Sequence, residues 1–196
     1  MKVTKAQAQE NRARIVETAS ALFRERGYDG VGVAELMAAA GFTHGGFYKH
    51  FRSKADLMAE AAACGISQTA TQTEGVDIPE FIKRYVSREH RDARSNGCTM
   101  AALCGDAARQ PAAIKATFAA GIESVLAALE REGVTLGAVD QGEARAKTID
   151  MLAHLIGALV LSRACPDDSP LADEILEVCR TQILAALSPA EAVKSR

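Results

Sequence analysis

The sequence predicts an all-α fold: an N-terminal three-helix bundle with a helix-turn-helix, followed by a larger helical domain, with about nine helices in all. Apolar residues recur at helical spacing in one segment after another, and no segment shows the alternation of a half-buried strand. Aromatic residues make up only 5% of the chain and Trp is absent, whereas Ala is frequent. This composition favours packed helices over sheets.

The first helix is predicted from Gln9 to Arg26, where apolar residues repeat every three to four positions. Gly27 follows at the position where the end of a helix favours a positive φ. A second, shorter helix is predicted from Val33 and is closed by Gly41, with Phe42 placed to fold back onto it as the apolar contact of a C-terminal cap.

A tight turn and a third helix complete a helix-turn-helix. Thr43 is expected to N-cap a helix from His44 to Phe51, and helix, glycine turn and helix follow each other at the spacing of this motif. Ser53 then begins a fourth helix, with an acid three residues later in the position of a capping box. We therefore expect a helix-turn-helix DNA-binding domain over residues 1–56 and a helical effector-binding and dimerisation domain over residues 57–196.

The rest of the chain is also predicted to be helical. The polar, glycine-bearing stretch 65–77 either frays the fourth helix or links two domains, and Asp77, Pro79 and Glu80 then provide the N-cap, proline and acid of a helix start. Further helices are expected over residues 100–109, 114–133, 144–163 and 171–187, with a loose tail over residues 188–196.

The last two predicted helices are apolar over much of their circumference. Two consecutive helices of this kind need both an internal core and an external partner. The small residues Ala153, Gly157 and Ala158 permit close approach of another helix. We therefore expect residues 144–163 and 171–187 to form the face of a homodimer.

Composition and charge exclude several classes of protein. The N-terminus lacks the apolar stretch of a signal peptide and no run of about 18 apolar residues occurs, so a cytoplasmic protein without membrane contact is expected. Five cysteines without a CxxC pair argue against a disulfide framework or a zinc site, and no metal or cofactor is expected. Residues 1–54 carry nine Lys and Arg against five Asp and Glu, although the whole chain has a net charge of -2. A basic segment on an acidic body favours binding to nucleic acid.

The motif around the predicted turn carries a family resemblance. Residues 41–54 have the sequence GFTHGGFYKHFRSK, preceded by Ala19, Leu22, Phe23, Gly27 and Tyr28 at fixed spacing. In these residues the chain closely resembles the TetR family of repressors, over roughly residues 10–60. The resemblance implies a DNA-binding head, a ligand-binding domain, a dimer formed mainly by the last two long helices, and release from DNA when a small molecule binds. It implies no enzyme activity.

The resemblance also implies which residues bind double-stranded DNA. The groove-facing positions of the recognition helix correspond to Thr43, His44, Gly45, Gly46 and Lys49, and the phosphate-contacting positions to Tyr48, His50 and Lys54. Tyr, His and Lys side chains are able donors to phosphate oxygens. Adjacent glycines near a helix start cost about 1 kcal/mol each relative to Ala, and close approach of the backbone to DNA would explain them. The positive charge of Lys54 in the first turn of the fourth helix is unfavourable to the helix dipole. Together with the free backbone N–H groups of that turn, it creates a site for an anion.

Other positions depart from the family pattern. Gly32 lies where Ser or Thr usually caps the second helix, and Ala34 and Glu35 replace residues that contact DNA in some members. Specificity is then expected to rest on Thr43, His44 and Lys49. Arg12 and Arg14 either flank the phosphates or form a solvated helix face. The expected target is a palindromic operator whose successive major grooves lie about 34–36 Å apart.

The sequence leaves three alternatives open, and it does not identify an effector or its pocket. Cys98 and Cys104 are either small buried core residues or a redox or electrophile switch. The switch is considered because a nearby Arg94 or Arg109 would favour the reactive thiolate. A helical enzyme that uses one of these thiols with His90 as base is the second alternative. The third is a dimeric ligand-binding or scaffold protein whose head no longer binds DNA.

Overall fold

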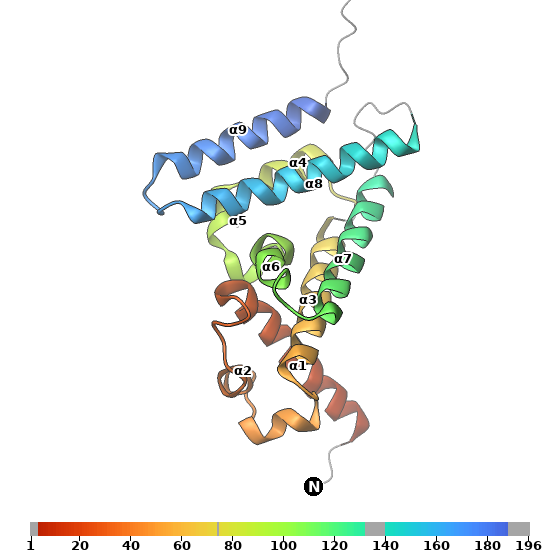
Figure 1. Cartoon of the computed structure of the whole chain (residues 1–196), viewed down its shortest axis with the longest axis vertical. Coiled ribbons are helices and arrows are strands. Elements are labelled where there is room, and N and C mark those ends of the chain that lie inside the picture. The colour runs from red at the N-terminus through yellow and green to blue at the C-terminus, as the bar shows by residue number, and fades with distance from the viewer. Residues whose placement is uncertain (1–3, 74, 132–139, 188–196) are drawn as a thin grey trace, which may run out of the picture. The chain divides into compact units, whose positions relative to one another are not determined.

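The structure, a computed structural model, describes residues 4–73, 75–131 and 140–187. Within these ranges the chain is helical and contains no strand, which confirms the predicted all-α class (Figure 1). The elements are α1 (Lys5–Arg26), α2 (Val33–Ala39), the 3-10 helix η1 (His44–Lys49), α3 (Lys54–Thr73), α4 (Ile78–Tyr85), α5 (Arg88–Asp92), the 3-10 helix η2 (Arg94–Asn96), α6 (Thr99–Ala107), α7 (Ala112–Arg131), α8 (Gln141–Ala164) and α9 (Pro170–Leu187).

The chain divides into two compact units. Unit 1 comprises Met1–Thr69 and Arg94–Gly121, and unit 2 comprises Ala70–Ala93 and Ile122–Arg196. Each unit is therefore assembled from two separate stretches of sequence.

Two helix starts are fixed by the local hydrogen bonds that the sequence predicts. The side chain of Ser53 accepts the N–H of Asp56 at 3.1 Å, and Asp77 accepts the N–H of Glu80 at 3.2 Å. The start of α1 is a correction, because Thr4 accepts the N–H of Gln7 at 3.1 Å and extends the helix beyond the predicted start. N-cap side chains satisfy backbone donors that the first turn of a helix leaves free.

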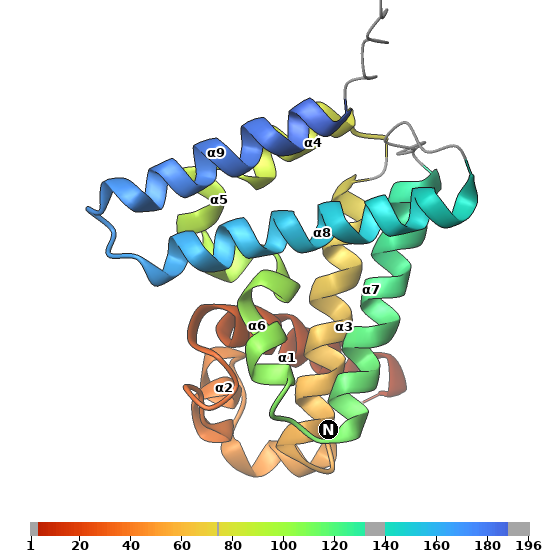
Figure 2. The same ribbon diagram turned by 45° about the horizontal axis from the view of Figure 1, so that its top comes forward.

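The core of unit 1 lies where α1 meets α2, η2 and α6, with η1 packed on α2 and with α3 and the first half of α7 beside them (Figure 2). Its largest buried side chains include Phe23, Leu36, Phe47 and Leu103, each at most 1% exposed. This packing holds the helix-turn-helix on a rigid base.

In unit 2, α8 and α9 form an antiparallel hairpin, with α4 packed on α9 and α5 on α8 (Figures 1 and 2). The fully buried Arg91 of α5 fixes the turn of this hairpin. Its guanidinium donates to the hydroxyl of Ser162 at 3.0 Å, to Asp167 at 2.9 Å and to the carbonyl of Cys165 at 3.1 Å. The predicted helices over residues 144–163 and 171–187 are confirmed, whereas residue 133 and the tail 188–196 lie outside the described residues.

One helix, α7, is long and apolar enough to cross a membrane by length and composition alone. Lys115 and Glu123 interrupt its apolar sequence. Three of its large apolar side chains, those of Ile114, Phe118 and Leu126, are at most 5% exposed. Burial of one apolar stripe is the behaviour of a core helix in a globular protein.

Candidate nucleic-acid interface

The turn after α2 has the geometry that the sequence predicts. The N–H of Gly41 binds the carbonyl of Ala38 at 2.9 Å, and the N–H of Phe42 binds the carbonyl of Met37 at 2.7 Å. Gly41 adopts a φ of 83°. These two bonds with a left-handed glycine form a Schellman motif, which ends the helix and reverses the chain. The prediction that Gly41 closes α2 is confirmed, and the apolar contact expected of Phe42 stays a prediction.

The segment after this turn is a 3-10 helix, not the predicted α-helix from His44 to Phe51. It ends at Lys49, and Thr43 occupies the N-cap position but makes no side-chain capping bond, so the prediction that its hydroxyl caps the helix was wrong. The carbonyl of Thr43 accepts the N–H of Gly46 at 2.9 Å, a bond between residues three apart. Two consecutive glycines, each unfavourable in an α-helix by about 1 kcal/mol, explain the tighter, irregular winding.

Two aromatic side chains anchor this segment. Phe47 and Phe51 are 1% and 3% exposed, and their ring centroids lie 5.5 Å apart. Phe47 contacts the ring of Tyr48 edge to face at 5.2 Å. Burial of Phe47 and Phe51 leaves the side chains between and before them on the outer surface.

Most of the predicted DNA-binding residues lie on this surface. Thr43, His44, Gly45 and Lys49 are exposed, and Gly46 is half-buried. Tyr48 is 71% exposed, although large aromatic side chains are normally covered. The segment therefore presents hydroxyl, imidazole and ammonium donors on one short stretch, which is what contacts to DNA phosphates and base edges require.

His50 and Lys54, which were predicted to contact phosphate, also make contacts within the protein. His50 is half-buried, with its ring 6.3 Å from that of Phe42, and its carbonyl accepts from Arg12 at 3.3 Å. The ammonium of Lys54, the first residue of α3, donates to the carbonyl of Tyr28. Lys54 therefore fastens the start of α3 to the turn after α1, and its remaining N–H groups are the ones that can reach an anion.

Comparison with known proteins places this region in a family. Residues 15–61 match the family model of bacterial regulatory proteins of the tetR family. The HTH-type transcriptional regulator AcrR of Shigella flexneri is 42% identical over 57 residues, which cover 29% of this chain and 26% of AcrR. TtgR of Pseudomonas putida is 44% identical over 55 residues, which cover 28% of this chain and 26% of TtgR. Over residues 15–61 the chain is therefore similar to bacterial regulatory proteins of the tetR family. The matched segments span about a quarter of the length of these relatives.

The fold agrees over a much larger part of the chain. A TetR-family regulator from Agrobacterium tumefaciens superimposes with a TM-score of 0.71 over 93% of this chain and 100% of that one, at 20% sequence identity. Identity this low shows a shared fold and no more.

Two arginines of α1 make contacts within the protein. Arg12 forms two hydrogen bonds with Glu60 of α3 and lies over the ring of Phe51 at 4.5 Å, and these bonds raise its pKa. Arg14 lies over the ring of Phe42 at 4.6 Å. Both side chains therefore stabilise the surroundings of η1, a role that the sequence did not predict.

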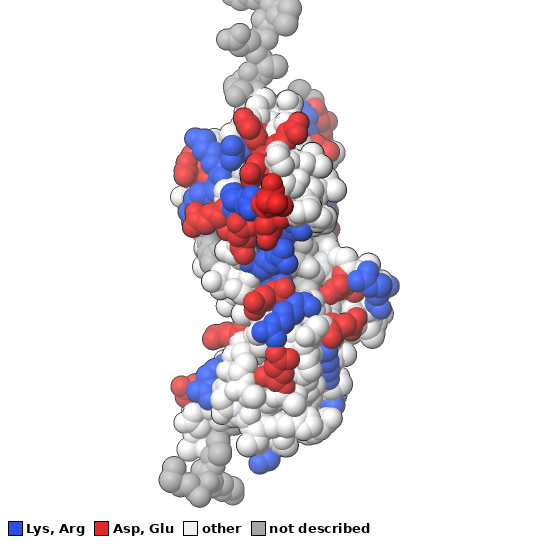
Figure 3. Space-filling model, turned by 90° about the vertical axis from the view of Figure 1, so that its left-hand side faces the viewer, with Lys and Arg blue, Asp and Glu red and all other residues white. Residues whose placement is uncertain are grey.

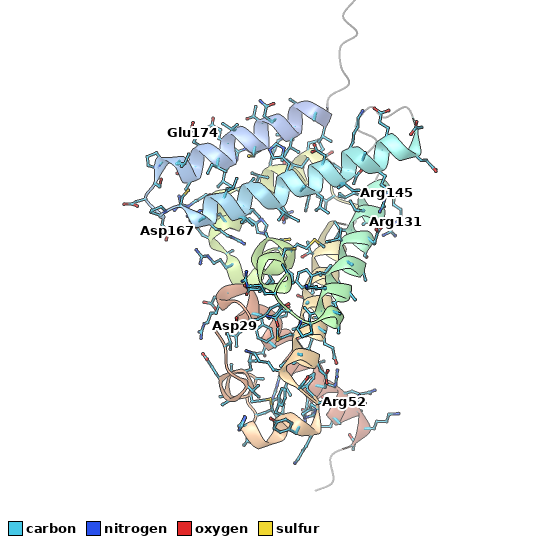
Figure 4. The ribbon with its side chains drawn as sticks, viewed as in Figure 1. Asp29, Arg52, Arg131, Arg145, Asp167 and Glu174 are labelled. Carbon is cyan, nitrogen blue, oxygen red and sulfur yellow. The ribbon has the colours of Figure 1, made fainter. Side chains whose placement is uncertain are left out.

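The departures from the family pattern have clear structural outcomes. Gly32 is the N-cap of α2 and offers no side-chain bond. The carboxylate of Glu35 pairs with Arg26, so its charge is partly compensated on the protein and repels phosphate less than the sequence suggested. Arg52, labelled in Figure 4, is an exposed cation between η1 and α3 that the sequence prediction omitted, although it belongs to the same basic motif. On the face shown in Figure 3, basic and acidic side chains are interspersed.

The cysteines do not show the environment of a reactive thiol. Burial raises the pKa of the Cys104 thiol to about 11, and Cys98 is 7% exposed. A raised pKa leaves less of the thiolate that reacts with oxidants and electrophiles. His90, the base of the enzyme alternative, has a pKa lowered by burial, and its Nδ1 lies 2.7 Å from the carbonyl of Tyr85.

Proposed function

We propose that this TetR-family chain is a cytoplasmic, homodimeric, sequence-specific transcriptional regulator, and specifically a repressor that a small molecule releases from a palindromic operator. In this proposal residues 1–56 bind DNA and residues 57–196 bind the effector and dimerise. The observation that carries the proposal is the pairing of buried Phe47 and Phe51 with an outer surface of exposed donors on η1. A rigid, donor-rich segment of this kind fits a major groove.

Within this site the residues have different roles. His44 and Lys49 reach base edges, because their donors are exposed and match acceptors in the major groove. Gly45 and Gly46 let the backbone approach the DNA closely. Tyr48 donates its hydroxyl to a phosphate, which positions the protein without reading sequence. His50 and Lys54 act from the edge of the segment, since both are also bound within the protein.

The dimer surface is proposed on α8 and α9. Ile149, Val160 and Leu161 of α8 are 46%, 45% and 59% exposed, and Leu171 and Val178 of α9 are 52% and 51% exposed. Large apolar side chains gathered on adjacent helices mark an interaction surface. A second copy covers them most simply, because one self-complementary patch on a two-fold axis suffices.

A hollow of about 290 Å³ lies between α8 and α9 and is lined by Lys147, Asp150, Met151, His154, Gln182, Ile183 and Ala186. It lies on the helices proposed for dimerisation, and we assign it to that surface.

The alternatives are less well supported. The raised pKa of Cys104 disfavours a thiol switch or thiol enzyme at that residue. The exposed donors of η1 disfavour a scaffold whose head has lost DNA binding, since nothing in folding requires an exposed tyrosine there.

The proposal is tested by gel shift on the DNA upstream of the gene, over a range of salt concentrations. The affinity of a regulator falls steeply with salt because phosphate contacts release counterions. Lys49→Ala and Tyr48→Phe should each weaken binding about three- to tenfold, and Lys49→Ala should lower the salt slope by about one if Lys49 also neutralises a phosphate.

Lys115→Ala is the matched control, because Lys115 is an exposed lysine on α7 outside the site. It removes the same charge and should leave both affinity and salt slope unchanged. If the wild-type protein shows no binding, or binding that salt does not weaken, the proposed function is refuted.

A further inference from the structure

Asp106, on α6, binds the main chain of the turn between α1 and α2. Its Oδ2 accepts the backbone N–H of Tyr28 at 3.0 Å, and its Oδ1 accepts from Arg109 at 2.7 Å. Asp106 lies far along the chain from the DNA-binding motif, and no motif in the sequence marks it. The contact therefore joins α6 to the turn that leads into the helix-turn-helix.

The end of α1 needs this contact in a way that the end of α2 does not. At the end of α2, the N–H groups of Gly41 and Phe42 both bind carbonyls of the same helix. At the end of α1, only the N–H of Gly27 returns to its own helix, at 2.8 Å from the carbonyl of Phe23. The next N–H, that of Tyr28, binds Asp106 instead. A backbone N–H in the turn beyond the helix needs a hydrogen-bond partner, and here α6 supplies it.

Gly27 makes room for the carboxylate. Its φ is 74°, and a Cβ at this position would lie 2.7 Å from Oδ2 of Asp106. That distance is shorter than van der Waals contact allows. Glycine therefore supplies both the left-handed backbone and the space through which Asp106 reaches Tyr28.

Tyr28 is held from three sides. Its N–H binds Asp106, its carbonyl binds Lys54, and its ring is fully buried with its centroid 5.1 Å from that of Phe23. Both polar groups of its backbone are thus bound to side chains of other helices. Four residues separate Tyr28 from the start of α2 at Val33, so these bonds help to set the direction in which α2 and η1 are presented.

We propose that Asp106 is a positioning residue for DNA recognition, whose carboxylate fixes the turn after α1 and thereby the orientation of the helix-turn-helix. This inference rests on the proposed function.

The bond itself is tested first, without DNA, by amide hydrogen exchange at Tyr28. We expect this amide to be protected in the wild-type protein and in Arg109→Ala, and its protection to fall about tenfold or more in Asp106→Ala. Asp106→Asn should restore most of the protection, because the amide oxygen accepts the same bond. Equal exchange in Asp106→Ala and the wild type would overturn the inference.

The positioning role is tested with operators whose half-sites are moved apart or together by one base pair. The wild-type protein should discriminate strongly between these spacings, because rigid heads fit one spacing. Asp106→Ala should bind the natural operator about tenfold more weakly and lose most of the discrimination, with Asp106→Asn close to wild type. A uniformly weaker protein with unchanged spacing preference would show a purely structural role and refute the inference.

Arg109→Ala is the matched control, since it removes the exposed ion-pair partner of Asp106 and leaves the bond to Tyr28. If Asp106→Ala does not fold, Asp106→Ser replaces it, because the shorter side chain cannot reach Tyr28. Absence of DNA binding by the wild-type protein refutes the proposed function, whereas normal binding with unaltered variants refutes only the role of Asp106.

Discussion

Replacing Gly41 with Ala adds one methyl group to the turn of the helix-turn-helix, and the structure fixes the expected cost. Gly41 has a φ of 83°, where an L-residue with a Cβ is disfavoured by about 1–2 kcal/mol. The nearest atom to the added Cβ would be a guanidinium nitrogen of Arg14 at 3.3 Å. This atom ends an exposed, flexible side chain that can move, so it adds little. We expect the free energy of unfolding to fall by about 1–2 kcal/mol.

The same methyl group should have the opposite effect at Gly105. This residue lies in α6 without a positive φ, and no heavy atom lies within 4 Å of an added Cβ. Ala is favoured over Gly in a helix, so Gly105→Ala should raise the free energy of unfolding by about 0.5–1 kcal/mol. Gly41→Asn should fall between Gly41→Ala and the wild type, because Asn tolerates left-handed backbone better than Ala.

Urea denaturation followed by circular dichroism measures these differences, and gel shift measures the accompanying change in operator affinity. Gly41→Ala should also weaken DNA binding, because the turn places η1. The reasoning fails if Gly41→Ala is as stable as the wild type, or if Gly105→Ala is destabilised to the same extent.

Three further predictions concern the rest of the chain. Leu161→Asp, at a side chain that is 59% exposed, should convert the dimer to monomers in analytical ultracentrifugation with little loss of helix, whereas Ala116→Asp on the exposed side of α7 should not. Arg91→Ala should lower the free energy of unfolding by about 2–4 kcal/mol in urea denaturation, because the substitution removes a buried guanidinium and leaves its acceptors unpaired. The control Arg84→Ala, at an exposed site, should change the free energy of unfolding by less than about 0.5 kcal/mol. The rate of Cys104 alkylation by iodoacetamide should keep rising as the pH is raised towards about 11, because burial raises the pKa of the thiol and the thiolate is the reactive form. A rate that levels off near neutral pH would instead support a thiol switch at Cys104.

The sequence by itself determined the local elements of this protein. The spacing of apolar residues predicted the helices, and Gly27, Gly41, Ser53 and Asp77 marked helix ends that the structure contains. The exposed and buried faces of η1 also followed from the motif, since Phe47 and Phe51 repeat at helical spacing. These features depend on hydrogen bonds and side-chain faces within a few residues, so neighbouring residues suffice to specify them.

The tertiary structure decided what the charged residues do. Lys54 and Arg12 were predicted or considered for phosphate contact, but they bind Tyr28 and Glu60, which lie 26 and 48 residues away in the sequence. The contact of Asp106 with Tyr28 spans 78 residues. A long charged side chain on a helix can reach solvent, DNA or another helix with similar local geometry. Which partner lies within hydrogen-bond distance of the charged group depends on how distant segments pack against each other. The sequence alone does not specify that distance.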